Sequence, residues 1–370
     1  MQAADLSLPV LCGQIIVGGF DGTALPDRFA KSLREGLRGG AILFKRNVLD
    51  LPSTHALCSA IREVCPSELP PFIAVDQEGG RVARLRGWFP ALPPMRLVGR
   101  TEDFHLASRV GKHLGRALAA LGFNLDFAPV LDVDSNPDNP IIGDRSFATR
   151  ADLVASLAVA FALGLEESGV LSCGKHFPGH GDTSVDSHVG LPIVHHERSR
   201  LAEVELVPFR AYAQAGLGTL MTAHVVVTSL DAKVPATLSP SVCTDLLRRD
   251  VGFRGVLFSD DLEMAAVAAT YAIEDSAVLS IRAGCDALLV CSNEDFQDRA
   301  HAALVRECER DATFRARCIE AVDRSLVARR KRPPRPAPSA ADARDIIVDV
   351  ESLGLLGEIE RRAAMPDRLT

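Results

Sequence analysis

The chain has 370 residues, of which 47% are hydrophobic and 24% charged, and its formal net charge is -7 at pH 7. This composition is that of an ordinary globular protein. An acidic chain whose basic residues are dispersed lacks the electrostatic footprint of a nucleic-acid-binding protein, and no run of about 18 apolar residues predicts a membrane span. We therefore expect neither nucleic acid nor membrane as a partner.

The cysteines and the N-terminus predict a compartment. Nine cysteines are irregularly spaced, and no Cys-x-x-Cys pair occurs among them. An odd number with this spacing argues against a disulfide framework or a cysteine zinc site. Residues 1–5 lack the positive and long apolar regions of a signal peptide. The sequence thus predicts a cytoplasmic protein with reduced thiols.

Short apolar runs of strand length alternate with helix-period segments along the chain. Continuous apolar strands separated by helices are typical of a parallel sheet covered on both faces. Eight of them predict an α/β fold, the (β/α)8 TIM-type barrel; an open doubly wound sheet is the alternative. The expected strands are 14–17, 40–44, 72–75, 125–128, 171–174, 219–223, 256–259 and 287–290. The expected helices are 28–37, 53–64, 104–120, 151–167, 199–214, 240–248, 274–283 and 294–308.

The end of the chain differs in composition from the rest. We expect residues 1–330 to form a single catalytic barrel domain and residues 331–370 a proline-rich linker with a C-terminal helix over about 340–363. That helix is expected to pack on the barrel or on a second copy of the chain. The basic cluster at 329–332 is interpreted as a solvated hinge, because no aromatic residues interleave with it.

Polar residues follow several expected strands at the point where each strand ends. In a TIM-type barrel, catalytic residues lie at the carboxyl ends of strands and in the following loops. The residues in such positions are Asp76, Lys175, His176, His224 and Asp260. The stretches 129–149, 176–197 and 225–240 are long for simple turns, and such loops are commonly functional.

Asp260 follows an apolar strand in GVLFSDDLEM, residues 255–264. A carboxylate at this end of a barrel can attack an anomeric carbon and form a covalent glycosyl-enzyme. A helix cap or an internal ion pair is the alternative for Asp260. The neighbouring Asp261 is predicted to be the N-cap of a helix that begins near Leu262.

The segment KHFPGHGDTSVDSH, residues 175–188, contains three histidines and two aspartates. Asp186 and His188 are two residues apart, so on extended backbone both side chains point to one side. A carboxylate beside an imidazole fixes its tautomer and raises its basicity, which gives a general acid/base near neutrality. A loop whose polar groups merely satisfy one another is the alternative.

A metal site is also considered for this segment. His176 and His180 have the spacing of a helical metal-binding pair, but Pro178 and Gly179 between them disfavour a helix. Without that helix the spacing loses its geometric meaning. We therefore expect no metal and no other cofactor.

Further side chains are candidates for binding a sugar. Asp76, Arg81 and Arg84 come from VDQEGGRVARL, where a carboxylate can accept two hydroxyl groups and an arginine offers a planar set of donors. For any one of the candidates, a structural ion pair or a core hydrogen bond explains the residue equally well. The other candidates are Arg145, Lys175, His176 and His224.

Taken together, these pieces resemble glycoside hydrolase family 3, in particular its single-domain bacterial β-N-acetylglucosaminidases. They occur in order over residues 39–264, and the segment 175–188 is the most specific. The matching pieces are GGAILFKRN (39–47), AVDQEGGRVARL (74–85), NLDFAPVLDVD (124–134), IIGDRSF (141–147), KHFPGHGDTSVDSH (175–188), MTAHV (221–225), PATLS (235–239) and GVLFSDDLEM (255–264).

The resemblance implies a retaining hydrolysis in which Asp260 is the nucleophile and the Asp186–His188 dyad is the acid/base. It implies removal of N-acetylglucosamine from muropeptide fragments during cell-wall recycling in the cytoplasm. Many members of the family carry a second α/β domain that supplies a carboxylic acid/base; no such domain fits after residue 310, which favours the dyad. The residues implied to bind N-acetylglucosamine are Asp76, Arg84, Arg145, Lys175 and His176.

Other functions remain open at this point. The same site could use phosphate in place of water or accept a β-glucoside. A different class of enzyme is a metal-dependent barrel hydrolase that uses His176, His180 and Asp186. A catalytically silent sugar-binding protein is disfavoured, because binding alone requires neither a nucleophile nor an acid/base.

Overall fold

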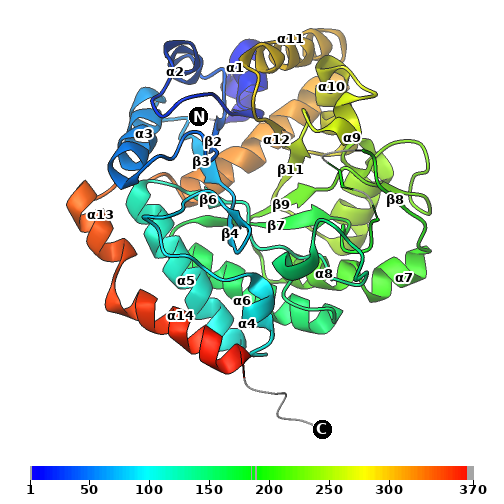
Figure 1. The fold of residues 1–370 in the computed structure, drawn as a ribbon. Coiled ribbons are helices and arrows are strands. Elements are labelled where there is room, and N and C mark those ends of the chain that lie inside the picture. Colours follow the sequence, from blue (N-terminus) through cyan, green and yellow to red (C-terminus); the bar gives the residue numbers. More distant parts are fainter. Residues whose placement is uncertain (1, 185, 188–189, 365–370) are drawn as a thin grey trace.

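The computed structural model describes residues 2–184, 186–187 and 190–364, with the backbone alone for 350–353. Parallel strands form a closed barrel surrounded by helices (Figure 1), which confirms the predicted fold class. Each expected strand overlaps one strand of this barrel. In barrel order the strands are β1 (Ile16–Gly18), β2 (Gly40–Leu43), β3 (Phe72–Val75), β6 (Leu125–Asp126), β7 (Leu171–Phe177), β9 (Thr219–Thr222), β11 (Val256–Asp261) and β12 (Ala287–Val290), which pairs with β1.

The interior of the barrel is packed with apolar side chains from these strands. The ring of Phe258 meets Phe72 and Phe127 edge-on, with centroid separations of 5.2 and 5.4 Å. Val17 and Ile42 belong to the same buried cluster. Edge-to-face contacts of this kind stabilise an aromatic pair beyond the area it buries. The barrel is therefore a filled core, and a ligand must bind at one of its ends.

The surrounding helices pack closely where glycine permits it. In α5 and α6, a Cβ on Gly111 would lie 2.0 Å from the carbonyl oxygen of Phe161, and one on Gly164 would lie 2.1 Å from that of Ser108. The predicted helix 199–214 is two helices, α7 and α8. The helices that precede the C-terminal segment are α1 (Leu8–Gly13), α2 (Asp27–Arg34), α3 (Leu51–Val64), α4 (Met95–Gly99), α5 (Phe104–Leu121), α6 (Ala151–Glu167), α7 (Arg198–Glu203), α8 (Leu206–Gln214), a π-helix (Ser241–Val251), α9 (Ala265–Ala268), α10 (Ile273–Ala283), α11 (Glu294–Arg310) and α12 (Ala312–Lys331).

Short elements lie in the loops at the carboxyl ends of the strands. Two two-stranded sheets, β4–β5 and β8–β10, extend beyond the barrel. These loop elements are β4 (Gln77–Gly79), β5 (Val82–Ala83), β8 (Ile193–Val194), β10 (Val226–Val227) and the 3-10 helices η2 (Gly143–Arg145) and η3 (Ala236–Leu238); a further 3-10 helix, η1 (Ala3–Asp5), precedes α1.

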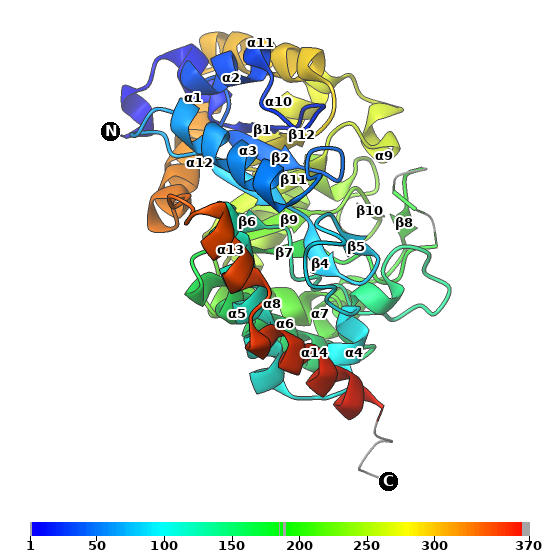
Figure 2. The ribbon, with the colours of Figure 1, turned by 60° about the vertical axis from the view of Figure 1, so that its left-hand side comes forward.

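The C-terminal segment packs on the outside of its own barrel (Figure 2). It forms two helices, α13 (Ala340–Ile347) and α14 (Val350–Ala363), where the sequence predicted one. Ile347 and Ile359 are buried against the body of the molecule. Arg109 of α5 pairs with Glu358 at 2.9 Å, and Arg362 pairs with Asp103 at 2.8 Å. No helix among the described residues is both long and apolar enough to span a lipid bilayer.

The interpretation of residues 329–332 as a solvated hinge is wrong for Arg329. This arginine lies in α12 with 0% exposure, and its Nη1 donates to Gln14 Oε1 at 2.8 Å and to the carbonyl oxygens of Gly39 and Pro70 at 3.0 Å. Its guanidinium also stacks over the ring of Phe72 at 5.2 Å. Neighbouring arginines of this basic cluster therefore differ in burial: Arg329 is buried and Arg330 is exposed. The reason is that successive side chains of a helix point in different directions.

We predict that Arg329→Ala lowers the free energy of unfolding by about 3 kcal/mol, because it leaves a cavity and several buried acceptors without a donor. Urea unfolding measures the change. Arg330→Ala, one residue further along α12 and exposed, is the matched control and should unfold close to wild type. Equal midpoints for the two variants would contradict the structural role of Arg329.

Candidate active site

A cavity of about 380 Å³ opens at the carboxyl ends of the barrel strands. Its wall combines apolar side chains with a dense set of charged groups. Most of the predicted site residues line it together. These are Asp76, Arg84, Arg145, Lys175, His176 and Asp260.

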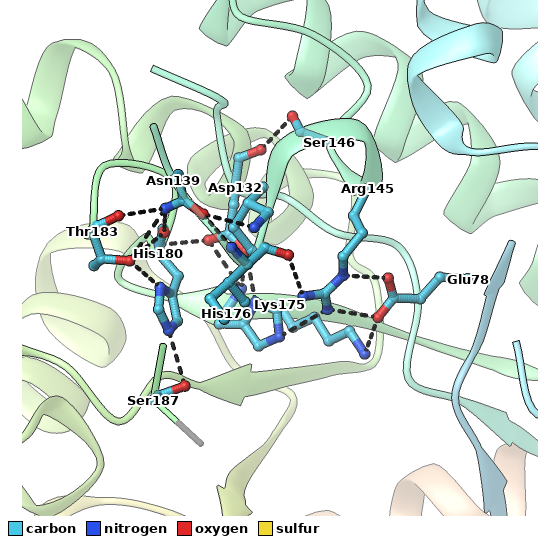
Figure 3. Close-up of polar contacts among 12 residues, drawn as sticks. Glu78, Asp132, Asn139, Arg145, Ser146, Lys175, His176, His180, Thr183 and Ser187 are labelled. Carbon is cyan, nitrogen blue, oxygen red and sulfur yellow. Dashed lines mark hydrogen bonds and ion pairs between the residues drawn. The ribbon is translucent and has the colours of Figure 1, made fainter. Parts of the chain in front are cut away.

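An ion-pair network centred on Lys175 forms one wall of the cavity (Figure 3). Lys175 Nζ lies 2.9 Å from Asp76 Oδ1 and 2.6 Å from Glu78 Oε1, and its side chain is 3% exposed. Arg145 binds Glu78 with both Nε and Nη2 at 2.8 Å. Arg84 Nη2 contacts Asp76 Oδ2 at 3.1 Å. The two carboxylates thus fix three cations, which come from β7, from η2 and from the residue after β5.

The charges of this network favour its ionised form. Burial alone would raise the pKa of the Glu78 carboxyl, but the attraction of Arg145 and Lys175 outweighs burial and holds that pKa below its ordinary value. For Lys175 burial would lower the pKa, and Asp76 and Glu78 reverse the direction. The cavity therefore presents side chains that are already charged and can hydrogen-bond to the polar groups of a ligand.

His176 is oriented by a buried carboxylate. Its Nδ1 lies 2.6 Å from Asp132 Oδ2, and Nε2 lies 3.5 Å from Arg145 Nη2. Burial would raise the pKa of Asp132, but the neighbouring His176 lowers it overall, so the carboxylate is charged. An Nδ1–H that donates to this carboxylate leaves Nε2 as the ring atom directed toward the cavity.

The segment after β7 is fixed over the cavity by His180 (Figure 3). The His180 ring pairs with Thr183 Oγ1 at 2.7 Å through Nδ1 and with Ser187 Oγ at 3.1 Å through Nε2. Asn139 Nδ2 donates to the carbonyl oxygens of His180 and Thr183 at 2.8 and 2.9 Å. Burial, reinforced by His176, lowers the pKa of His180 to about 4. A neutral ring therefore acts as a spacer that positions Ser187 in the cavity wall.

These contacts bear on the metal alternative. Both ring nitrogens of His180 are engaged by hydroxyl groups, and Nδ1 of His176 is engaged by Asp132. Within residues 2–184, 186–187 and 190–364, no group of three or more His, Cys, Asp or Glu side chains is arranged to hold a metal ion.

The acid/base dyad is only partly described. The carbonyl oxygen of Asp186 accepts from the Gly190 backbone N–H at 2.9 Å, and Ser187 lines the cavity next to it. His188 lies outside the described residues. Pairing of Asp186 with His188 therefore stays a prediction.

Asp260 reaches the cavity because β11 is longer than predicted and continues to Asp261. Asp260 Oδ1 accepts from the Asp261 N–H at 2.8 Å, and its own N–H lies 3.3 Å from Thr222 Oγ1 on β9. A carboxylate fixed by the end of a strand has little freedom to turn away. This placement gives the cavity a nucleophile candidate beside the network of Lys175.

The predicted N-cap role of Asp261 is wrong. The next helix, α9, begins at Ala265, and Asp261 Oδ1 instead accepts from the N–H groups of Glu263 at 3.1 Å and Cys291 at 3.2 Å. The carboxylate therefore closes the loops after β11 and β12. Burial raises its pKa to about 7.

Two sequence candidates lie away from the cavity lining. His224 has 0% exposure, and its ring nitrogens contact Thr237 Oγ1 at 2.8 Å and the carbonyl oxygen of Asp261 at 2.9 Å. Arg81 donates to the carbonyl oxygen of Ile142 at 3.1 Å. Both side chains thus connect loops that carry other site residues.

Sequence reasoning missed Glu78 and Asp132. Glu78 had a usable signal, because it lies two residues after Asp76 and side chains at that spacing share one side of a strand. Asp132 had none: it lies beyond the expected end of its strand, and its partner His176 is 44 residues away.

We predict that the pH dependence of stability changes in Asp261→Asn. The folded-state pKa of about 7 lies above the unfolded value of 3.8, so stabilisation by the protonated carboxyl is present below the lower value and is lost as pH rises toward the upper one. Relative to Asp261→Asn, wild type should lose about 1.4 kcal/mol of unfolding free energy for each pH unit within this window. Urea unfolding of both proteins from pH 4.5 to 7.5 measures the difference, and a constant difference contradicts it.

Comparison with known sequences gives close relatives. A family model described as the glycosyl hydrolase family 3 N-terminal domain matches residues 12–324. A beta-hexosaminidase of Neisseria meningitidis serogroup C is 39% identical over 300 residues, covering 79% of this chain and 82% of that protein. A beta-hexosaminidase of Thiobacillus denitrificans is 41% identical over 289 residues, covering 76% of this chain and 79% of that protein.

Comparison with solved structures also finds members of this family. A glycoside hydrolase family 3 beta-N-acetylglucosaminidase from Paenibacillus sp. matches with a TM-score of 0.89 and 35% identity, covering 97% of this chain and 69% of that chain. NagZ from Neisseria gonorrhoeae, in complex with N-trifluoroacetyl-D-glucosamine, matches with a TM-score of 0.75 and 32% identity, covering 94% of this chain and 98% of that chain. These similarities confirm the resemblance drawn from the motifs.

Proposed function

This chain belongs to glycosyl hydrolase family 3, and from that premise we propose that it is a retaining exo-β-N-acetylglucosaminidase. The observation that carries the proposal is a single cavity that holds the Asp260 carboxylate together with the charged network around Lys175. The relatives named above are called hexosaminidases and N-acetylglucosaminidases, which supports N-acetylglucosamine as the sugar.

In the first step, Asp260 attacks the anomeric carbon, and the bond from that carbon to the leaving oxygen breaks. His188, oriented by Asp186, gives its proton to the leaving oxygen. In the second step, neutral His188 takes a proton from water, which attacks the glycosyl-enzyme and releases the sugar with retained configuration. The fixed position of Asp260 at the end of β11 supports its role as the nucleophile.

The charged network around Lys175 binds the sugar. Asp76 offers carboxylate oxygens to sugar hydroxyl groups, Arg84 and Lys175 offer donors, and His176 offers Nε2 as an acceptor. Arg145 adds a further donor and keeps its guanidinium in place through Glu78. Because these groups are already paired, they lose little freedom when the sugar binds.

Replacement of Asp260 tests the proposed nucleophile. Asp260→Ala should lower kcat for an aryl β-N-acetylglucosaminide by about 10⁴-fold, because no covalent intermediate can form. Nitrophenol release in EDTA, with aryl β-glucoside as the second substrate, measures activity and sugar preference together. Asp345→Ala, on the exposed face of α13, is the control and should match wild type.

Several outcomes would overturn this assignment. Undiminished release by Asp260→Ala would show that Asp260 is not the nucleophile. Preference for the glucoside would show that N-acetylglucosamine is not the preferred sugar. Loss of wild-type activity in EDTA would favour the metal-dependent class. Sugar 1-phosphate formed only when phosphate is added would identify a phosphorylase.

Replacement of Asp186 tests the acid/base dyad. A poor leaving group requires protonation, whereas nitrophenolate leaves without it. Asp186→Asn should therefore lower kcat by about 10²–10⁴-fold on an alkyl N-acetylglucosaminide and far less on the nitrophenyl substrate at the glycosylation step. Pre-steady-state kinetics on both substrates measure that step. An equal loss on both would contradict the dyad.

We further propose muropeptide fragments as the natural substrate and the cytoplasm as the compartment. All nine cysteines are free, which accords with a reducing environment. Incubation with purified muropeptides should release N-acetylglucosamine. Turnover of chitin oligosaccharides without turnover of muropeptides would contradict this substrate.

A further inference from the structure

Three cysteines cluster at the end of the barrel opposite the cavity. Cys12 lies in α1 just before β1, Cys308 in the last turn of α11, and Cys318 in α12. Cys308 Sγ is 3.7 Å from Cys12 Sγ and 3.5 Å from Cys318 Sγ. The three helices contact one another pairwise, and α1 and α11 lie side by side in both ribbon views (Figures 1 and 2). The Cys308 thiol is thus in contact with both of the other two.

The central position makes Cys308 chemically different from its neighbours. The contacts with the Cys12 and Cys318 thiols lower the pKa of Cys308, and the nearby Arg315 acts in the same direction. The same contacts raise the pKa of Cys12 and Cys318, which keep their protons. The thiolate is the nucleophilic form of cysteine, so this arrangement supplies one nucleophile and two resolving thiols.

Access to the cluster also favours Cys308. It is 4% exposed, whereas Cys12 and Cys318 are 0% exposed. The two residues that follow it, Glu309 and Arg310, are exposed at the end of α11. Helix ends fray more readily than helix centres. A small oxidant therefore reaches Cys308 before the other two.

We propose that Cys12, Cys308 and Cys318 form a peroxide-reactive site in which Cys308 is oxidised first and then joins either neighbour in a disulfide. The Cys308 thiolate attacks one oxygen of hydrogen peroxide, the O–O bond breaks, and the departing hydroxide takes a proton to leave as water. The sulfenic acid on Cys308 is then attacked by the thiol of Cys12 or Cys318, and a second water leaves. Two thiols lose two electrons, and one peroxide becomes two waters.

The geometry requires only a small movement. Bond formation brings the sulfur atoms from the present contact to about 2.05 Å, an approach of roughly 1.5 Å between side chains on packed helices. Because Cys308 is shared, only one of the two disulfides can exist at a time. Exchange between them needs no further oxidant, since the remaining thiol can attack the existing bond.

Another pair of cysteines serves as an internal comparison. Cys243 and Cys285 also interact, but each thiol donates to a backbone carbonyl oxygen, that of Ala236 at 3.2 Å and that of Thr237 at 3.8 Å. Burial raises the pKa of Cys285. The cluster around Cys308 is therefore expected to react first.

The test uses the full chain exposed to a stoichiometric amount of hydrogen peroxide, followed by alkylation in denaturant and mass spectrometry without reduction. Wild type should lose two alkylatable thiols, and peptide mapping should find Cys308 bound to Cys318 or Cys12. Cys12→Ser should still form the disulfide between Cys308 and Cys318. Cys318→Ser should still form the disulfide between Cys12 and Cys308. Cys243→Ser is the matched control and should behave like wild type.

Cys308→Ser should keep all its remaining thiols under the same treatment, and circular dichroism checks that it is folded; Cys308→Ala replaces it if it is not. The proposal is overturned if wild type keeps all its thiols, if the disulfide joins other cysteines, or if the Cys308 variants form one at the wild-type rate. The readout is independent of catalysis, so the inference stands or falls separately from the proposed function.

Discussion

The buried ammonium group of Lys175, shared by Asp76 and Glu78, is the interaction on which the candidate active site depends. It joins β7 to the segment after β3, and the two strands are separated in the barrel by β6 alone. Each carboxylate then fixes an arginine, so one ammonium sets the positions of Arg84 and Arg145 indirectly. Removing a single partner would leave an uncompensated buried charge, which is far more costly than the pair is stabilising. We therefore expect the removal of any one of these charged side chains to disrupt the whole network.

A second layer of contacts supports this network from outside the cavity. Arg96 on α4 pairs with Asp134 at 2.6 Å and donates to the carbonyl oxygens of Gly143 and Ser146 at 3.2 Å, which fixes the turn that carries Arg145. In turn, α14 packs on α4. The C-terminal segment thus contributes to the shape of a site from which it is distant in the sequence, and Asp132 and Asn139 do the same for the segment after β7.

The barrel was predictable because its strands are buried on both faces and read as continuous apolar runs. Phe72–Val75 and Ala287–Val290 were predicted to the residue. Strand ends were harder: β7 and β11 continue through Lys175 and Asp260, since polar residues there satisfy one another in the cavity. Asp76 and Asp260 were found because chain position predicts strand ends, and Asp132 was missed because only tertiary contact links it to His176. Arg329 and Asp261 were misread because burial depends on distant segments.

The most direct test of the central claim is to identify the atom that carries the sugar during turnover. Wild type is mixed with an activated N-acetylglucosaminide whose intermediate hydrolyses slowly, quenched in acid and digested for mass spectrometry. We expect the peptide containing Asp260 to gain the mass of one sugar residue through an ester to its carboxylate. A sugar found on another residue, or rapid turnover with inversion and no labelled peptide, would contradict it.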